Sequence, residues 1–369
     1  MSNHHPTHGG NRERDILVIG AEDVQRLLGR KQDEVIEVIR EAYKLHASGD
    51  SLLPHSLFLS LPQAQDARII ALPAYLGGQF DTAGLKWIAS FPVNVENGLD
   101  RASAVLILNS MDTGRPKAIL EGSIISAGRT AASAALAARE LRSEPYETIG
   151  MIGCGVINLN IARFLTRTCP EIRNVIVYDL ELARARAYKE ECETLLDKVC
   201  VRIAGQKDEI YKHCNLISFA TAAGKPHVDD LSLCAPGTVI LHISLRDLSP
   251  EVILAADNVV DDVDHVCRAQ TSIHLAEQLT GHRNFIRCTL GDILTQKAEA
   301  RPDKSRPVIF SPFGLGILDV ALGEYVFQHA MSKGTGEIIR SFLPDSWRRT
   351  SKAGSQQEQI TPGAAADQC

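Results

Sequence analysis

A glycine-rich segment in the middle of the chain has the residue types that bind the pyrophosphate of a dinucleotide. It covers residues 149–158, with the sequence IGMIGCGVIN, and lies between a predicted strand and a predicted helix. Gly153 permits a tight turn there, and Gly155 lets the backbone approach a pyrophosphate at the N-terminus of the helix. The alternative is a plain turn between a strand and a helix.

The first turn of that helix extends the predicted cofactor site. Val156 and Ile157 open the helix, and we include both among the cofactor-binding residues. Asn158 stands where a third glycine or an alanine is expected, so we also include it and expect looser packing of the helix on the strand at this point.

An acidic residue at the end of the next predicted strand indicates NAD. Asp179 follows the glycines at a spacing of about twenty residues, where a carboxylate accepts hydrogen bonds from both ribose hydroxyls. A 2′-phosphate would be repelled there and no arginine directly follows, which favours NAD over NADP. A simple N-cap for a helix from Glu181 onward is the alternative. Thr221 and Ser244 end two further predicted strands and complete the predicted cofactor contacts.

From Thr148 onward, the elements that position these residues alternate between short β-branched runs and helical segments. This alternation predicts βαβ units around a parallel sheet, an α/β fold of the doubly wound Rossmann type. The strands are expected at residues 148–153, 174–179, 216–221, 238–244, 258–261 and 308–312.

The residues before Thr148 have an antiparallel pattern, which predicts a separate α+β domain. A hairpin is expected over 109–116, where Asp112 and Gly114 lie between two apolar runs. The remaining strands are expected at 56–61, 67–73, 83–91 and 103–109, and helices at 21–28, 32–47, 126–141 and 317–330.

The helix at 126–141 is expected to bridge two domains, and the last helix to return the chain to the first of them. We therefore assign residues 15–143 with 317–345 to one domain and 144–316 to the other. The polar ends of the chain, residues 1–14 and 346–369, are predicted to be disordered.

Composition excludes several classes of protein. The formal charge of −6 argues against a broad attraction to nucleic acid or anionic lipid. Apolar runs stay short of the roughly 18–20 residues that span a bilayer, and the N-terminal residues lack the apolar core of a secretory signal, so a cytoplasmic protein is expected. The nine cysteines form no C-x-x-C pair, which favours reduced, packed thiols. The His and acidic residues lack metal-ligand spacing, so no metal is expected.

Three motifs resemble the ornithine cyclodeaminase/mu-crystallin family. They are Gly84-Leu85-Lys86-Trp87, the run 126–134 with the sequence SAGRTAASA, and the fingerprint around Gly153. Their order and spacing are those of the family, and the resemblance extends over roughly residues 16–329. It implies that the first domain carries the substrate site and the dimer interface, while the second domain binds the nucleotide.

Five further segments resemble one subgroup of that family, whose members oxidise N-(2-amino-2-carboxyethyl)-L-glutamate in the biosynthesis of L-2,3-diaminopropionate for siderophores and peptide antibiotics. The resemblance implies hydride transfer from the glutamate Cα to NAD⁺, giving an imine that water splits into 2-oxoglutarate and L-2,3-diaminopropionate. The segments cover residues 53–56, 71–78, 86–92, 101–108 and 311–319.

A substrate with several carboxylates needs fixed cations, and the family motifs supply candidates. Lys86 and Arg129 match its substrate-binding positions, and Lys86 is also a catalytic candidate; the alternatives are a solvated strand residue for Lys86 and an ion pair capping the bridging helix for Arg129. Arg101 either holds a further carboxylate or is a surface charge. His55 stands near the position of an arginine that grips the substrate in the cyclodeaminases, and it either replaces that arginine or only packs.

Asp247 aligns with the catalytic aspartate of the family. It follows the strand expected at 238–244 and so lies at the carboxyl end of the sheet, where a proton carrier would face the nicotinamide. The alternative is an N-cap for the helix that starts at Ser249-Pro250-Glu251.

Other functions remain open at this stage. The chain could cyclise ornithine to proline and ammonia, aminate a small 2-oxo acid such as pyruvate, or bind nucleotide and ligand without turnover as crystallin-type relatives do. The missing arginine near His55 argues against the first two, and the retained Lys86, Arg129 and Asp247 argue against the third. The resemblance also implies a homodimer, and functional coupling to an upstream PLP-dependent synthase is conceivable.

Overall fold

The structure is a computed structural model that describes residues 14–62, 64–196 and 198–344. The disorder predicted for the two ends of the chain falls on residues outside these ranges, apart from Arg14. No helix within the described part is long and apolar enough to cross a membrane.

The first half of the chain builds a mixed sheet, sheet A, in the order β16-β1-β7-β6-β5-β4-β2, with β3 also paired to β4. All its pairs are antiparallel except β1 with β7. The predicted hairpin is confirmed, because β6 pairs with β7 and the Ser110 amide donates to the Arg115 carbonyl. Its strands are β1 (Ile16–Ile19), β2 (Ser51–Leu52), β3 (Leu57–Leu61), β4 (Ala64–Leu76), β5 (Thr82–Ser90), β6 (Ala102–Asn109), β7 (Pro116–Glu121) and β16 (Glu337–Ile339).

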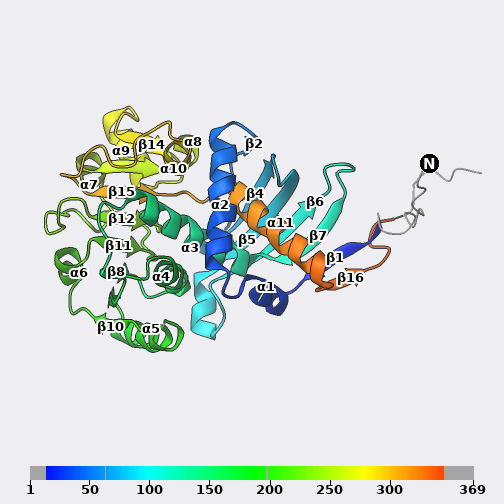
Figure 1. Ribbon diagram of the computed structural model, residues 1–369, viewed down its shortest axis with the longest axis horizontal. Coiled ribbons are helices and arrows are strands. Elements are labelled where there is room, and N and C mark those ends of the chain that lie inside the picture. Colours follow the sequence, from blue (N-terminus) through cyan, green and yellow to red (C-terminus); the bar gives the residue numbers. More distant parts are fainter. Residues whose placement is uncertain (1–13, 63, 197, 345–369) are drawn as a thin grey trace, which may run out of the picture.

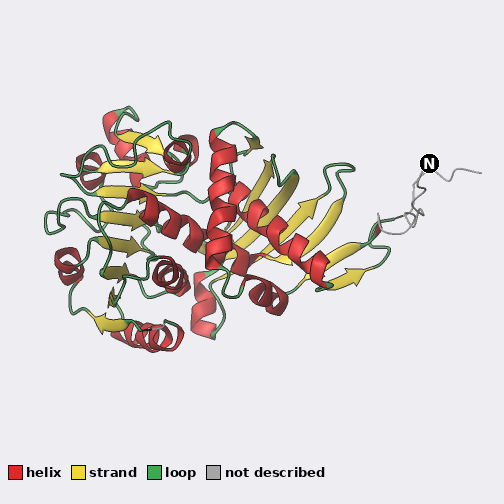
Figure 2. Ribbon diagram, in the orientation of Figure 1, coloured by secondary structure: helices red, strands yellow, loops and turns green. Residues whose placement is uncertain are grey.

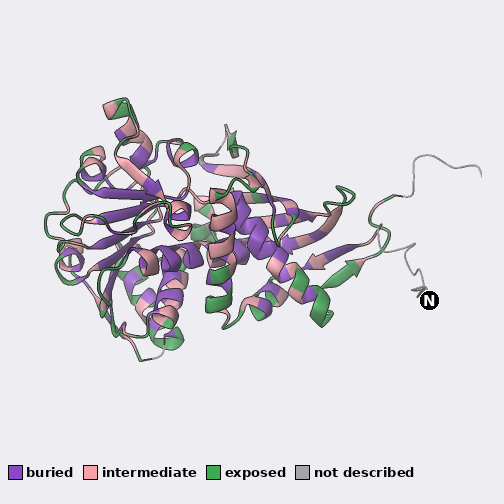
Figure 3. Ribbon diagram, turned by 45° about the horizontal axis from the view of Figure 1, so that its top comes forward, coloured by how far each residue is buried: buried purple, intermediate pink, exposed green. Residues whose placement is uncertain are grey.

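Helices cover only one face of sheet A (Figure 1). The long helix α11 runs across β4, β5 and β6, and α2 and α3 pack against it. Residues on the inner side of α11 are buried, whereas much of the outer edge of the part formed by sheet A and its helices is exposed (Figure 3). The helices of this part are α1 (Ala21–Leu28), α2 (Gln32–Ala47), α3 (Gly122–Leu141) and α11 (Gly316–Lys333), with a 3₁₀ helix η2 at Pro92–Asn97.

The second part of the chain forms sheet B, an all-parallel sheet in the order β10-β9-β8-β11-β12-β15-β13-β14. The strand order reverses between β8 and β11, which makes the carboxyl ends of these two strands the ligand crevice of a doubly wound sheet. Its strands are β8 (Thr148–Ile152), β9 (Asn174–Tyr178), β10 (Cys200–Ile203), β11 (Leu216–Phe219), β12 (Val239–His242), β13 (Asp257–Val260), β14 (Ile286–Thr289) and β15 (Val308–Ser311).

Helices flank sheet B on both faces, as an α/β sandwich requires (Figure 2). Five of its strands, β8, β11, β12, β13 and β15, are almost wholly buried for the same reason. The helices are α4 (Val156–Thr168), α5 (Leu182–Leu195), α6 (Lys207–His213), α7 (Pro250–Ala255), α8 (Val263–Val266), α9 (Ser272–Thr280) and α10 (Leu290–Leu294).

The predicted fold class is confirmed, with several local differences. Strands β2, β10, β14 and β16 were not predicted. Helix α3 begins at Gly122, one turn before the predicted Ser126, because the Glu121 carboxylate accepts from the amides of Ser123 and Ile124 and caps the helix there.

Candidate active site

Two buried cations share one carboxylate between sheet A and its helices. Lys86 of β5 donates from Nζ to Asp319 Oδ2 at 2.7 Å, and Arg129 of α3 donates from Nε to Asp319 Oδ1 at 3.1 Å. The Ser126 hydroxyl lies between them, 3.1 Å from Lys86 Nζ and 3.4 Å from an Arg129 nitrogen. Asp319 is in the first turn of α11, where the helix dipole favours a negative charge.

These contacts decide the alternatives for both cations. Lys86 is only 2% exposed, so a solvated strand residue is wrong. Arg129 lies in the interior of α3 and does not cap it, although it does form an ion pair. Asp319 was missed as a site residue. Its signal was its place in the motif 311–319, five residues after Gly314.

Burial gives Lys86 an unusual pKa. Loss of solvation lowers the pKa of the Lys86 ammonium to about 8, against the attraction of Asp319 and with a smaller contribution from the Arg129 charge. Two cations and one carboxylate leave the cluster with a net positive charge when Lys86 is protonated. Such a cluster attracts a carboxylate, and Lys86 is able to exchange a proton near neutral pH.

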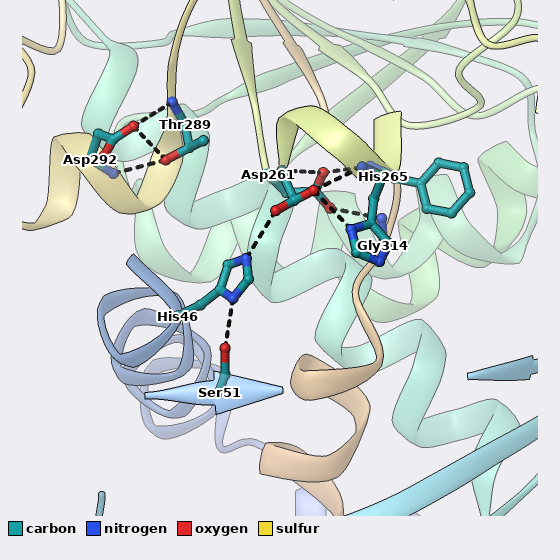
Figure 4. A network of polar contacts seen from close by, with 9 residues as sticks. His46, Ser51, Asp261, His265, Thr289, Asp292 and Gly314 are labelled. Atoms are coloured by element: carbon teal, nitrogen blue, oxygen red, sulfur yellow. Dashed lines mark hydrogen bonds and ion pairs between the residues drawn. The ribbon is translucent and has the colours of Figure 1, made fainter. Parts of the chain in front are cut away.

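A second buried carboxylate fixes the segment that connects sheet B to α11. Asp261, directly after β13, accepts from the amides of Phe313 and Gly314, each at 2.8 Å (Figure 4). A Cβ on Gly314 would lie 2.8 Å from Arg129, so this glycine with φ +92° lets the guanidinium approach the backbone. The cluster around Asp319 therefore lies beside the carboxyl end of sheet B.

Histidines connect the two parts of the molecule beside Asp261. His46 of α2 lies 3.2 Å from Asp262, and the Asp262 carboxylate also accepts from His265 at 2.8 Å. Burial would raise the pKa of Asp262, but the hydrogen bonds from His265 and His46 hold it well below its usual range. His55 is exposed and its ring packs edge-on against the His265 ring at 5.1 Å, so the structure shows packing for His55.

The glycine-rich turn has the geometry that a dinucleotide requires. Gly153 has φ +91°, and a Cβ there would lie 2.5 Å from the Ala220 carbonyl oxygen, so no larger residue fits. Gly155 is the N-cap of α4, and a Cβ there would meet no protein atom within 4 Å. The space in front of Gly155 is therefore open to a ligand.

Asp179 closes the other side of this turn. Its Oδ2 accepts from the Cys154 amide at 2.8 Å, and its Oδ1 accepts from the Glu181 amide at 3.0 Å. The N-cap of α5 is Glu181, so Asp179 is not a simple cap. Leu180 is 91% exposed beside it and was missed by the sequence reasoning, although its position directly after Asp179 was a signal.

Asn158 shows how α4 packs without the third small residue. It is fully buried, and its amide nitrogen donates to the carbonyls of Ile152 at 3.0 Å and Gly153 at 2.7 Å. The Ser218 hydroxyl of β11 donates to its Oδ1 at 2.7 Å. The larger side chain thus fills the space between helix and sheet with hydrogen bonds, where the sequence predicted looser packing.

Asp247 lies at the carboxyl end of β12 and is fully buried. Its carboxylate accepts from the hydroxyls of Thr221 and Ser244 and lies 3.1 Å from His227 Nε2. Burial would raise the pKa of Asp247, but hydrogen bonds and the charge from His242, together with the two hydroxyls, hold it far below its usual range. Ser249 caps α7, so the helix-cap alternative for Asp247 is wrong.

The remaining predicted residues lie at the edges of the site. Arg101 is exposed before β6 and donates to the Ser90 hydroxyl at 3.3 Å. Val156 is 63% exposed and Ile157 is half-buried in the first turn of α4. Within the residues that the structure describes, no three His, Cys, Asp or Glu side chains are grouped as metal ligands.

The model of the ornithine cyclodeaminase/mu-crystallin family matches residues 15–334. The chain belongs to this family. It is 26% identical over 335 residues to an N-((2S)-2-amino-2-carboxyethyl)-L-glutamate dehydrogenase of Staphylococcus aureus, with 89% of this chain and 99% of the relative covered. It is 28% identical over 340 residues to an alanine dehydrogenase of Archaeoglobus fulgidus, with the same shares covered. A solved archaeal alanine dehydrogenase dimer with bound NAD superposes with a TM-score of 0.79 at 28% identity, covering 88% of this chain and 99% of that one.

The two glycines of the turn give a matched pair of variants. Gly153→Ala is expected to lower the free energy of unfolding by about 2 kcal/mol or more, because its Cβ meets the Ala220 carbonyl at a positive φ. Gly155→Ala is expected to cost less than about 1 kcal/mol but to weaken NADH binding at least about tenfold, because the added methyl occupies the ligand's side. Chemical denaturation and NADH fluorescence titration measure both. Unchanged NADH affinity in Gly155→Ala would contradict the assigned cofactor position.

The depressed pKa of Lys86 predicts a pH-dependent stability. Because Lys86 loses its proton near pH 8 when folded and near pH 10.5 when unfolded, the unfolded chain binds more protons between these values, and stability from this group rises with pH. Between these two pH values, the free energy of unfolding of the wild type is expected to rise by about 3 kcal/mol relative to that of Lys86→Met. Denaturant titrations at pH 7 to 10 test this, with Lys86→Arg as the variant that keeps its charge. If the free energies of unfolding of the wild type and of Lys86→Met changed in parallel with pH, the lowered pKa of Lys86 would be refuted.

Proposed function

We propose that this chain catalyses the NAD-dependent oxidation of N-(2-amino-2-carboxyethyl)-L-glutamate, with water, to L-2,3-diaminopropionate, 2-oxoglutarate and NADH. The observation that carries the proposal is the buried cluster of Lys86, Arg129 and Asp319 beside the carboxyl end of sheet B, which has a net positive charge when Lys86 is protonated. It offers a carboxylate site next to a dinucleotide crevice. The relative from Staphylococcus aureus has this substrate in its name.

NAD fits the crevice at three points. Gly155 leaves the N-terminus of α4 open for the pyrophosphate, and Asp179 lies beside the turn to receive the ribose hydroxyls. The exposed Val156 and Leu180 offer apolar surface on either side of it. NAD⁺ supplies the hydride acceptor, and the side chains of the chain bind and orient the substrate.

The two cations have different tasks in the proposed reaction. The planar guanidinium of Arg129, oriented by Asp319, holds the α-carboxylate of the glutamate half. Lys86, with a pKa of about 8, accepts the proton of the substrate's amine nitrogen as the hydride leaves. Oxidation at Cα needs a neutral amine, so this proton transfer precedes or accompanies it.

Asp247 remains our candidate for assisting the hydrolysis of the imine, through its neighbours. A carboxylate with so low a pKa holds a proton poorly, but it fixes the hydroxyls of Thr221 and Ser244 and the ring of His227 at the crevice. We therefore propose that Asp247 orients these groups and that one of them faces the attacking water. His227 is 41% exposed, and its imidazole is the side chain of this set that we propose as the proton carrier.

The substrate is tested by absorbance at 340 nm with NAD⁺ or NADP⁺ and N-(2-amino-2-carboxyethyl)-L-glutamate, with L-alanine and L-ornithine in parallel. We expect NADH only with the first substrate, together with 2-oxoglutarate and diaminopropionate, and at least about a hundredfold lower rate in Arg129→Gln. NADH from alanine alone, or proline and ammonia from ornithine, would reject the proposed substrate and assign the chain to another reaction of its family.

We also propose a homodimer formed through the face of sheet A that carries no helices. Leu57, Leu59 and Trp87 share this face and are 70%, 48% and 40% exposed. Apolar groups gathered on one uncovered sheet face are typical of an interface. The cytoplasmic location and the coupling to an upstream synthase stay predictions.

The dimer is tested by the mass in solution. Trp87→Glu is expected to shift the protein from dimer to monomer in sedimentation experiments, because it places a charge in an apolar interface. Leu279→Glu, at an exposed leucine of α9, is the matched control and is expected to remain dimeric. A monomeric wild type would contradict the proposal.

A further inference from the structure

An arginine of β4 lies partly buried without a partner in the cleft between the two sheets. The Nε of Arg68 is shielded from solvent and makes no hydrogen bond. No carboxylate pairs with Arg68 among the side chains that the structure describes. A guanidinium desolvated in this way normally has an anion beside it, because burying an unpaired charge is costly.

Two further arginines surround this position from separate segments. Arg101 donates to Ser90, the residue of β5 that lies opposite Arg68 in the strand register. Arg246, in the loop after β12 of sheet B, donates to the Ala269 carbonyl at 2.6 Å. Burial lowers the pKa of Arg68, and the charges of Arg246 and Arg101 lower it further, with no acid opposing them. We call Arg68, Arg101 and Arg246 the outer arginines.

Arg68 lies on the same side of sheet A as the Lys86 cluster. Lys86 and Ser90 are four residues apart on β5 and so face the same way, about 13 Å apart at roughly 3.3 Å per residue. Lys86 lies opposite Leu72 on β4, as Ser90 lies opposite Arg68. Helix α11 begins against Leu72, since a Cβ on Gly316 would lie 3.1 Å from the Leu72 carbonyl oxygen. The sheet beyond Leu72 therefore faces the loops of sheet B.

A small cavity opens at this end of the cleft. It has a volume of about 150 Å³ and is lined by Ser56, Phe58, His265, Arg268, Ala269 and Phe313. Phe58 lies opposite Ile70, which shares its face with Arg68, and the Ala269 carbonyl holds Arg246. Arg268 adds a fourth cation on its wall. The space between the two sheets is thus cationic at both ends.

We propose that the outer arginines form a second carboxylate subsite that makes the enzyme selective for substrates with a carboxylate remote from the reacting carbon. Arg68 and Arg246, reaching in from opposite domains, bind that carboxylate, and Arg101 adds to its attraction. The span between the Lys86 cluster and the outer arginines is shortened by side chains that extend from both ends. It therefore suits a ligand with a chain of several atoms between two carboxylates. Alanine or proline would occupy only the Lys86 end. The proposed subsite rests on the proposed function, and it specifies that the remote carboxylate is the feature by which the enzyme selects its substrate.

Asp247 does not neutralise the subsite. Burial lowers the pKa of Arg246, and the charge of Asp247 only opposes this shift. The carboxylate oxygens of Asp247 already accept from Thr221 and Ser244 and lie near two histidines. Arg68 has no such acid near it. A bound carboxylate would supply the missing charge.

The test uses the NADH-loaded protein and titration calorimetry, which requires no turnover. The probes are pyruvate with one carboxylate, 2-oxoglutarate with two and N-(2-amino-2-carboxyethyl)-L-glutamate with three. In Arg68→Gln and Arg246→Gln, we expect at least one of the two larger anions to bind about tenfold or more weakly, while the affinity for pyruvate changes less than about twofold. Arg68→Lys is expected to fall between wild type and Arg68→Gln.

Arg306→Gln is the matched control, because Arg306 is exposed before the amino end of β15, away from the carboxyl end of sheet B, and pairs with Asp303. It is expected to bind all three probes as the wild type does. If Arg68→Gln does not fold, Arg101→Gln replaces it, since Arg101 is exposed. Equal weakening of all three probes, unchanged affinities, or no saturable binding of either larger anion to the wild type would overturn the subsite. Selective loss of binding in the variants, together with no NADH formation from the three-carboxylate probe and NAD⁺ in the absorbance assay of the wild type, would reject the proposed function and leave the subsite standing.

Discussion

The structure depends on one buried carboxylate that is shared by two cations. Asp319 binds Lys86 from β5 and Arg129 from α3, so it joins three elements that are far apart in the sequence. Removing one partner of such a set leaves an uncompensated charge in the interior, which is far more costly than losing a surface pair. The same arrangement has an excess of one positive charge. Stability and affinity for an acidic ligand therefore have a common source in this part of the molecule.

The two parts of the molecule are coupled through backbone contacts to acids at the end of β13. Asp261 holds the amides of Phe313 and Gly314, and Gly314 lies against Arg129, so the position of sheet B is transmitted to the cation that we propose binds the substrate. Asp262 extends the connection to His46 of α2. Motion between the two sheets would alter both the cluster and the cleft, which suits the proposed reaction, because that reaction excludes water before hydride transfer and admits it afterwards.

Local patterns predicted most of the fold, and tertiary contacts account for the remainder. Helices α1 and α2 have the predicted bounds because one face of each is apolar and each ends near a glycine or serine. Strands β10 and β14 have four residues of mixed exposure, a pattern too short to recognise. The turn around Gly153 was visible because its glycines are local in sequence. Asp319 and Arg68 were missed as site residues because the role of each side chain depends on residues from distant segments, and no spacing within the sequence reveals those neighbours.

The order of segments has a consequence for how the protein is made. Sheet B is built from one continuous stretch of the chain, whereas sheet A waits for α11 and for β16, which pairs with β1 across more than three hundred residues. During synthesis, the nucleotide-binding part has all its strands before the other part receives its last helix, and domains with complete sequence fold as units when they emerge. Lys86 and Arg129 are made well before their counter-charge, Asp319, which follows every strand of sheet B. The nascent chain thus carries two unneutralised cations in an unfinished core until α11 has been synthesised.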